Sequence, residues 1–259
     1  MTSDVYTEEF FRTIEEGALR SAREVVPMVM NFVQPRSVVD VGCGTGAWLS
    51  VFAESGVEDV FGVDGDYVPR DALRIPPDRF HVHDLSEPLQ LERTFDLVAS
   101  LEVAEHLPPD SASTFVDSLT RLGPVVLFSA AIPYQVGTGH LNLQWPDYWA
   151  WLFSERGYEV RDVIRPRVWA NENVDPWYAQ NILLFAREDY LRELWALMRE
   201  RRPELRELRI VHPTIFEWTV QDAQRQVPSP RSLLGRLPAT IGRRVKRARV
   251  EGSARPEAD

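Results

Sequence analysis

Three closely spaced glycines after an apolar run are the first feature of the sequence with a clear chemical use. Residues 38–41 are mostly apolar, Gly42, Gly44 and Gly46 follow, and residues 47–54 then have helical character. A strand, a tight turn and the start of a helix are therefore predicted. Glycines in such a turn let backbone N–H groups approach a ligand closely, and the helix N-terminus favours negative charge.

An acidic side chain extends this predicted site. The next apolar run, residues 60–63, ends at Asp64. A carboxylate at the tip of a strand can accept two hydrogen bonds from the hydroxyl groups of a ribose. The glycine turn and Asp64 together predict a nucleoside-containing cofactor on a doubly wound α/β sheet.

The glycine spacing does not by itself identify the cofactor, because residues 42–47 also fit the dinucleotide pattern G-x-G-x-x-A. Three features favour S-adenosylmethionine over NAD. Asp40 lies inside the first strand, where it can face an ammonium group. Asp84, followed by Leu85, ends a third apolar stretch and suits an adenine amino group. The sequence also has no second glycine-rich turn and no evident nicotinamide-side domain.

At these residues the chain resembles the class I S-adenosylmethionine-dependent methyltransferases, over roughly residues 36–187. The glycines and Asp40 match the first motif of the family, Asp64 its ribose acid, and Asp84 with Leu85 its adenine contact. Leu101 and Glu102, at the end of the fourth strand, are expected beside the methionine part. The expected cofactor-binding residues are Asp40, Gly42, Gly44, Gly46, Asp64, Tyr67, Asp84, Leu85, Leu101 and Glu102.

Alternating apolar runs and helical segments predict an α/β fold with helices on both faces of a largely parallel sheet. Helical spacing over residues 5–34 predicts one or two helices before the sheet. The resemblance implies a Rossmann-like, doubly wound, seven-stranded sheet whose last strand is antiparallel. Strands are predicted near residues 37–41, 58–63, 79–82, 95–100, 124–130, 158–163 and 180–186.

The chain divides into four predicted segments. They are an N-terminal helical cap (1–34), an S-adenosylmethionine-binding methyltransferase domain (35–187), a C-terminal helical extension (188–230) and a basic, partly disordered tail (231–259). The tail has two interpretations: a solvated end, or a segment that weakly contacts an anionic membrane surface or a phosphorylated substrate. The sequence leaves the oligomeric state open.

Composition and charge argue against several classes of protein for this chain. The chain has 259 residues and a net charge of −10, which argues against nucleic acid as the main partner. Its one cysteine, Cys43, allows no intrachain disulfide. No apolar run approaches the roughly 20 residues of a membrane-spanning helix, and the N-terminus has no signal-peptide pattern. A cytoplasmic enzyme is expected.

Three titratable residues beyond the predicted strand ends are candidates for catalysis. A hydroxyl acceptor needs a base that removes its proton. His140 lies in a glycine-containing loop after the fifth strand and is the candidate general base, with a structural hydrogen-bonding role as the alternative. Glu105 and His106, after the fourth strand, either close the cofactor site or pack and cap a helix, and His106 is a second candidate base.

The stretch from residue 137 to residue 146 resembles a bacterial subgroup that includes sugar and polysaccharide O-methyltransferases. Leu143 stands where an acid is expected in much of that subgroup, and if that acid binds substrate or metal, the specificity of this chain differs there. Aromatic faces stack on sugar rings and amides bind hydroxyl groups. The candidate substrate-binding residues are Asn142, Gln144, Trp145, Tyr148 and Trp169.

The predicted function is O-methylation of a sugar or a hydroxylated small metabolite, with a small molecule or glycan as partner. Methylation of oxygen or nitrogen in a non-sugar natural product is the alternative. An NAD-dependent oxidoreductase and a non-catalytic S-adenosylmethionine-binding protein are alternatives of other classes. Glu102, Glu105, His106 and His140 could contribute to a divalent metal site, but the sequence has no spaced set of ligands such as H-x-x-x-H. No metal ion is therefore predicted, and the need for one is left open.

Overall fold

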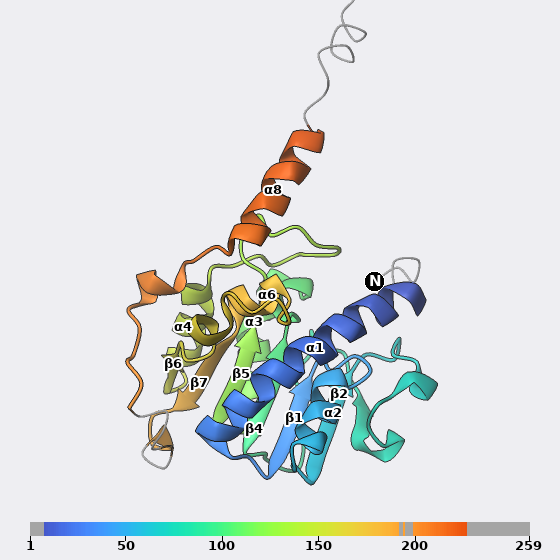
Figure 1. The fold of residues 1–259 in the computed structure, drawn as a ribbon. Helices are drawn as coiled ribbons and strands as arrows, with labels where there is room; N and C mark the ends of the chain where they lie inside the picture. The colour runs from blue at the N-terminus through green and yellow to red at the C-terminus, as the bar shows by residue number, and fades with distance from the viewer. Residues whose placement is uncertain (1–7, 192–193, 195–198, 227–259) are drawn as a thin grey trace, which may run out of the picture. The chain divides into compact units, whose positions relative to one another are not determined.

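The structure is a computed structural model that describes residues 8–191, 194 and 199–226. In these residues a seven-stranded sheet has the order β3-β2-β1-β4-β5-β7-β6, and β7 runs antiparallel to both of its neighbours (Figure 1). The strands are β1 Ser37–Val41, β2 Asp59–Asp64, β3 Phe80–Val82, β4 Leu97–Leu101, β5 Val125–Ser129, β6 Tyr158–Arg161 and β7 Leu183–Arg187. The predicted doubly wound, Rossmann-like fold with an antiparallel last strand is confirmed.

The middle of the sheet consists of β1, β4 and β5, which are almost entirely buried. Strands covered on both faces read as continuous apolar runs, as these do. Asp40 interrupts the run in β1. It stands in register with Gly62 of β2 and Ala99 of β4, so its neighbours on both sides are small.

Helices cover both faces of the sheet. The core on one face includes residues of α1, α2, α5 and α6, and the core on the other includes residues of α3 and α4. Figure 1 shows α1, in dark blue, running across the first of these faces, beside α2. The helices are α1 Glu8–Val33, α2 Ala47–Glu54, α3 Ala112–Leu122, α4 Pro146–Ser154, α5 Arg165–Val168, α6 Pro176–Asn181 and α8 Pro213–Gln226. The short 3₁₀ helices are η1 Arg70–Ala72, η2 Pro77–Arg79, η3 Ala104–His106, η4 Pro109–Ser111 and η6 Leu205–Leu208.

The N-terminal helix α1 is one continuous helix with Pro27 inside it, which is one of the two predicted alternatives. One strand boundary differs from the sequence-based expectation. The last strand begins at Leu183, because α6 occupies the start of the range predicted for that strand. Pro176 stands at the beginning of α6, where its fixed φ suits the first helical turn.

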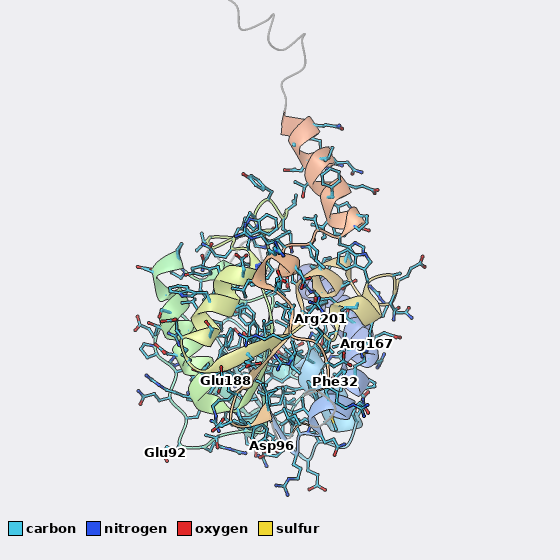
Figure 2. The ribbon with its side chains drawn as sticks, turned by 90° about the vertical axis from the view of Figure 1, so that its left-hand side faces the viewer. Phe32, Glu92, Asp96, Arg167, Glu188 and Arg201 are labelled. Carbon is cyan, nitrogen blue, oxygen red and sulfur yellow. The ribbon has the colours of Figure 1, made fainter. Side chains whose placement is uncertain are left out.

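The amino end of the sheet is fastened by polar contacts far from the glycine turn. The Asp96 carboxylate accepts hydrogen bonds from the N–H groups of Arg36 and Ser37, at 2.8 and 3.1 Å. Figure 2 shows Asp96 at this end of the sheet, at the bottom of the view.

A second contact joins two helices, and Figure 2 shows its residues, Arg167 and Phe32, beside each other. The guanidinium carbon of Arg167 lies 5.2 Å from the centre of the Phe32 ring, which links α5 to the end of α1.

By its internal contacts the chain divides into two compact units, Met1–Phe216 and Glu217–Asp259. The four segment boundaries proposed from the sequence stay a prediction, and the basic tail lies outside the described residues. Within the described part of the chain, no helix combines the length and the apolar character needed to cross a membrane.

Candidate active site

The glycine turn after β1 uses backbone conformations that residues with side chains rarely adopt. Gly42, Gly44 and Gly46 have φ values of 88°, 53° and 88°. A Cβ atom added at Gly42 would lie 2.3 Å from a methyl carbon of Val103, whereas one added at Gly44 would meet no atom within 4 Å. Gly44 therefore borders open space, where a ligand can approach the backbone.

Asp64, at the end of β2, is buried and holds this turn in place. Its carboxylate accepts hydrogen bonds from the N–H groups of Gly44 and Gly65, at 2.6 and 2.7 Å, and from the Tyr67 hydroxyl. Burial raises the pKa of Asp64 above its ordinary value, although these three hydrogen bonds lower it. Two carboxylate oxygens offer about four lone-pair positions, so acceptor capacity remains for a ribose hydroxyl.

Asp40 lies two residues before the turn, with its side chain 2% exposed. In the described part of the chain, its Oδ1 atom has no hydrogen-bond partner. Burial, and then the nearby charge of Asp64, raise the pKa of Asp40 to about 8. A buried carboxylate is unfavourable unless it is paired, so the side chain is suited to a cationic group brought by a ligand.

Asp84 and Leu85 follow β3 and are joined to the end of β2. The N–H of His83 donates to the carbonyl oxygen of Asp64 at 2.9 Å. Leu85 is buried, whereas Asp84 is exposed and accepts hydrogen bonds from the Ser86 N–H and hydroxyl at 3.0 and 2.7 Å. These hydrogen bonds lower the pKa of Asp84. The adenine-binding role of the pair stays a prediction.

Glu102 follows β4 in a left-handed backbone conformation, with a φ of 57°. Its carboxylate accepts hydrogen bonds from Asn181 at 3.1 Å and from Gln135 at 3.4 Å. Burial raises the pKa of Glu102 to about 7, although hydrogen bonds from Asn181 and other neighbours lower it. The Gln180 amide donates in turn to Gln135 at 2.9 Å. Sequence reasoning placed Glu102 beside Leu101 near the cofactor but missed these amide partners.

Glu105, His106 and His140 come together beyond the ends of β4 and β5. Their ligand-type atoms all lie within 4.8 Å of one another, and the two imidazole centroids are 5.1 Å apart. The carbonyl oxygen of Glu105 accepts hydrogen bonds from the N–H groups of Leu141 and Asn142, at 2.7 and 3.0 Å. These backbone bonds fasten the glycine-containing loop to η3.

Burial shifts the pKa values of the three side chains of this cluster in different directions. Glu105 is 1% exposed, and burial followed by the charge of Glu102 raises its pKa well above the ordinary value. Burial lowers the pKa of both His106 and His140, and the charge of His140 lowers that of His106 further. Both imidazoles are therefore neutral at pH 7.

Backbone carbonyls select one tautomer of each histidine. His106 Nδ1 lies 3.3 Å from the Gly139 carbonyl oxygen, and His140 Nδ1 lies 3.3 Å from that of Gln135. A carbonyl oxygen only accepts hydrogen bonds, so these contacts place the proton on Nδ1 and leave Nε2 as an acceptor.

The predicted substrate residues fall into two groups. Asn142 is buried and accepts a hydrogen bond from Gln144 at 3.0 Å, and Trp145 and Tyr148 follow, half-buried, at the start of α4. Trp169 packs against a different partner, with its ring centroid 4.9 Å from that of His212. Contact of these residues with a substrate stays a prediction.

Glu15 of α1 is a further site residue, and no pattern in the sequence points to it. It accepts a hydrogen bond from the Thr45 hydroxyl at 3.0 Å and forms an ion pair with Arg74. Thr45 lies inside the glycine turn, so α1 supports the turn from outside the sheet. The helical spacing of α1 predicts its apolar face but not this polar contact.

Comparison with known proteins identifies the family. Residues 14–163 match the model of a family described as a methyltransferase domain. The chain belongs to this methyltransferase family. A comparison with curated proteins finds no match for this methyltransferase.

Solved structures share the fold of this methyltransferase at low sequence identity. Streptomyces venezuelae DesVI is 15% identical with a TM-score of 0.54, covering 70% of this chain and 96% of its own. The sugar N-methyltransferase KedS8 from a Streptoalloteichus species is 18% identical with a TM-score of 0.54, covering 72% and 97%. Magnesium protoporphyrin IX methyltransferase from Synechocystis, with bound S-adenosylmethionine, is 21% identical with a TM-score of 0.51, covering 71% and 86%.

S-adenosylmethionine is the cofactor of this methyltransferase, and the residues present fit it. Asp40 is a buried acid with an unpartnered oxygen, as a site for an ammonium group requires. Gly44 borders open space next to the Asp64 carboxylate, as a ribose site requires. The assignment of each residue to one part of the cofactor stays a prediction.

The raised pKa of Asp40 predicts a pH-dependent stability. The folded pKa is about 8 and the ordinary value 3.8, so the folded state binds this proton more tightly than the unfolded state does. The stabilisation is fully present below pH 3.8 and is lost as the pH rises through about 8. Asp40→Asn cannot ionise, so its free energy of unfolding falls less than that of the wild type between about pH 5 and pH 8.

Denaturant unfolding at several pH values measures this difference. Asp66→Asn, at an exposed acid two residues after Asp64, is the matched control and follows the wild type. The same pH dependence in Asp40→Asn and the wild type contradicts the account of Asp40.

Proposed function

We propose that this methyltransferase transfers a methyl group to a hydroxyl group of a sugar or a hydroxylated small metabolite. The observation that carries the proposal is the position of His140, a half-buried imidazole beyond the end of β5 with Nε2 left as an acceptor. An alcohol has to lose its proton as its oxygen forms a bond to carbon. In the protein without a metal ion, His140 Nε2 is the atom proposed to accept that proton.

S-adenosylmethionine supplies a methyl carbon on a positively charged sulfur, whose bond to that carbon breaks as the new bond to oxygen forms. The residues of the chain hold and orient the reactants. Asp40 is proposed to pair with the ammonium group and Asp64 to bind the ribose. Glu102, fixed by its amide partners Asn181 and Gln135, is proposed to border the methionine part.

Aromatic and amide side chains support a sugar-sized acceptor. Trp145 and Tyr148 lie half-buried at the start of α4, directly after the loop that carries His140. Aromatic faces bind sugar rings by stacking. The fold shared with the sugar N-methyltransferase KedS8 supports a small-molecule acceptor and makes an amino group the alternative.

A panel of matched sugars tests the proposal. Each hydroxylated sugar is paired with the amino sugar that differs at one position, and both are incubated with methyl-labelled S-adenosylmethionine. The expected result is label in hydroxylated sugars, with the methyl group located on oxygen by NMR. Label that enters amino sugars alone, on nitrogen, overturns the hydroxyl assignment.

A further inference from the structure

Glu105 is a buried acid whose carboxylate form has no cationic partner among the residues that the structure describes. It is 1% exposed, and neither carboxylate oxygen has a hydrogen-bond partner among the residues that the structure describes. A buried carboxylate is unfavourable unless a cation or hydrogen-bond donors compensate it. The neighbouring Glu102 adds a second acidic group to this edge and supplies no cation.

Two imidazoles lie near this carboxylate, and each has its Nδ1 atom beside a backbone carbonyl oxygen, as in many metal ligands. Histidines that bind metals almost always donate their second ring N–H to a carbonyl or carboxylate, which fixes the tautomer and the ring. His106 and His140 each place Nδ1 3.3 Å from a backbone carbonyl oxygen, which leaves Nε2 available. The loop also leaves room for the ring of His140, because a Cβ atom at Gly137 would lie 2.1 Å from its Cε1.

We propose that Glu105, His106 and His140 bind one divalent transition-metal ion. Their ligand-type atoms lie within 4.8 Å of one another. Atoms about 2.1 Å from a shared ion are roughly 3 to 4 Å apart, so small side-chain movements complete the site. Two imidazoles and one carboxylate favour zinc, iron, cobalt or manganese over magnesium and calcium, which prefer oxygen ligands.

The inference rests on the proposed function and gives His140 a different part in it. Three protein ligands leave coordination positions open for a substrate oxygen. An acceptor hydroxyl bound there has a lower pKa, and its proton passes to solvent water. His140 Nε2 then holds the ion, whereas in the ion-free protein it takes the proton itself.

Titration of the metal-stripped full-length chain with Co²⁺ tests the site. Visible absorption and calorimetry are expected to report one saturable ion per chain. Glu105→Gln, His106→Ala and His140→Ala are each expected to raise the Kd for Co²⁺ at least about tenfold. His81→Ala is the matched control, because His81 is an exposed histidine that stacks on His83 outside this cluster. It leaves the Kd of this site unchanged.

Thermal unfolding of each variant establishes that it is folded before its Kd is compared, and Glu105→Gln preserves side-chain volume. A wild-type chain without saturable Co²⁺ binding overturns the inference, as does binding that survives in the His106→Ala/His140→Ala double variant. The titration needs no methyl acceptor, so its failure leaves the proposed methyl transfer standing. A chain that binds Co²⁺ but methylates no hydroxylated acceptor rejects the proposed function instead.

Discussion

Replacing His140 with alanine is expected to lower the turnover number by about 10²- to 10⁴-fold. The affinity for S-adenosylhomocysteine is expected to stay close to that of the wild type, because the proposed cofactor contacts lie in β1, at the end of β4 and in the segments after β1, β2, β3 and β4, and do not include His140. Alanine has no imidazole ring, so the variant can act neither as the proposed proton acceptor nor as the proposed metal ligand. The measurement is kcat with an acceptor from the sugar panel, together with the Kd from calorimetry.

Two further variants separate the ring of His140 from general damage to the fold. Gly137→Ala keeps the histidine but puts a carbon where its ring lies, so it is expected to lower turnover in the same direction. Thr138→Ala, at the exposed residue between Gly137 and Gly139, is the control and is expected to retain turnover. A His140→Ala protein with wild-type turnover removes His140 from the catalytic machinery.

The second large effect is expected at Asp64, where replacement by alanine weakens S-adenosylhomocysteine binding by about 10- to 100-fold. A hydrogen bond to a charged group contributes about 1.5–3 kcal/mol, and about 1.4 kcal/mol corresponds to a tenfold change in affinity. Asp64 also holds the N–H groups of Gly44 and Gly65, so its loss loosens the turn as well as the ribose site.

Calorimetry with S-adenosylhomocysteine measures the Asp64 effect. Asp64→Asn retains the side-chain volume and one oxygen, so it is expected to lose less affinity than Asp64→Ala. Asp66→Ala, at the exposed acid nearby, is expected to bind like the wild type. An unchanged Kd in Asp64→Ala would reject the ribose assignment.

The local part of the fold could be predicted from the sequence because its signals are local. An apolar run, three glycines and a helical segment are adjacent in the chain, and they form β1, the turn and α2. The seven-stranded sheet with an antiparallel last strand follows from the family resemblance. The edge that holds His106 and His140 follows from the rule that ligands bind at the carboxyl ends of parallel strands.

Contacts between distant segments could not be predicted in the same way. Glu102 meets Asn181 and Gln135 because α6 and the loop after β5 converge on the end of β4. Glu15 reaches the glycine turn because α1 lies across α2. Each contact depends on how far a helix is shifted along the sheet. The spacing of apolar residues predicts which face of the helix is buried, but it does not determine this shift to better than about one helical turn.

The proposed metal site also depends on contacts between distant segments, which the sequence does not predict. His106 and His140 are far apart in the sequence and match no spaced ligand motif. His140 becomes a neighbour of Glu105 and His106 because the loop after β5 forms backbone hydrogen bonds with the carbonyl oxygen of Glu105. The sequence left the need for a metal open, because these residues match no spaced ligand motif, and the three-dimensional cluster is the reason for the present proposal.

A crystal structure of the full chain with S-adenosylhomocysteine would show whether one edge of the sheet binds both the donor and the acceptor. We expect the ribose on Asp64, the ammonium group beside Asp40, and the sulfur directed toward the edge that carries His106 and His140. A ligand that leaves Asp40 and Asp64 without contact, or whose sulfur points away from His140, would contradict this expectation.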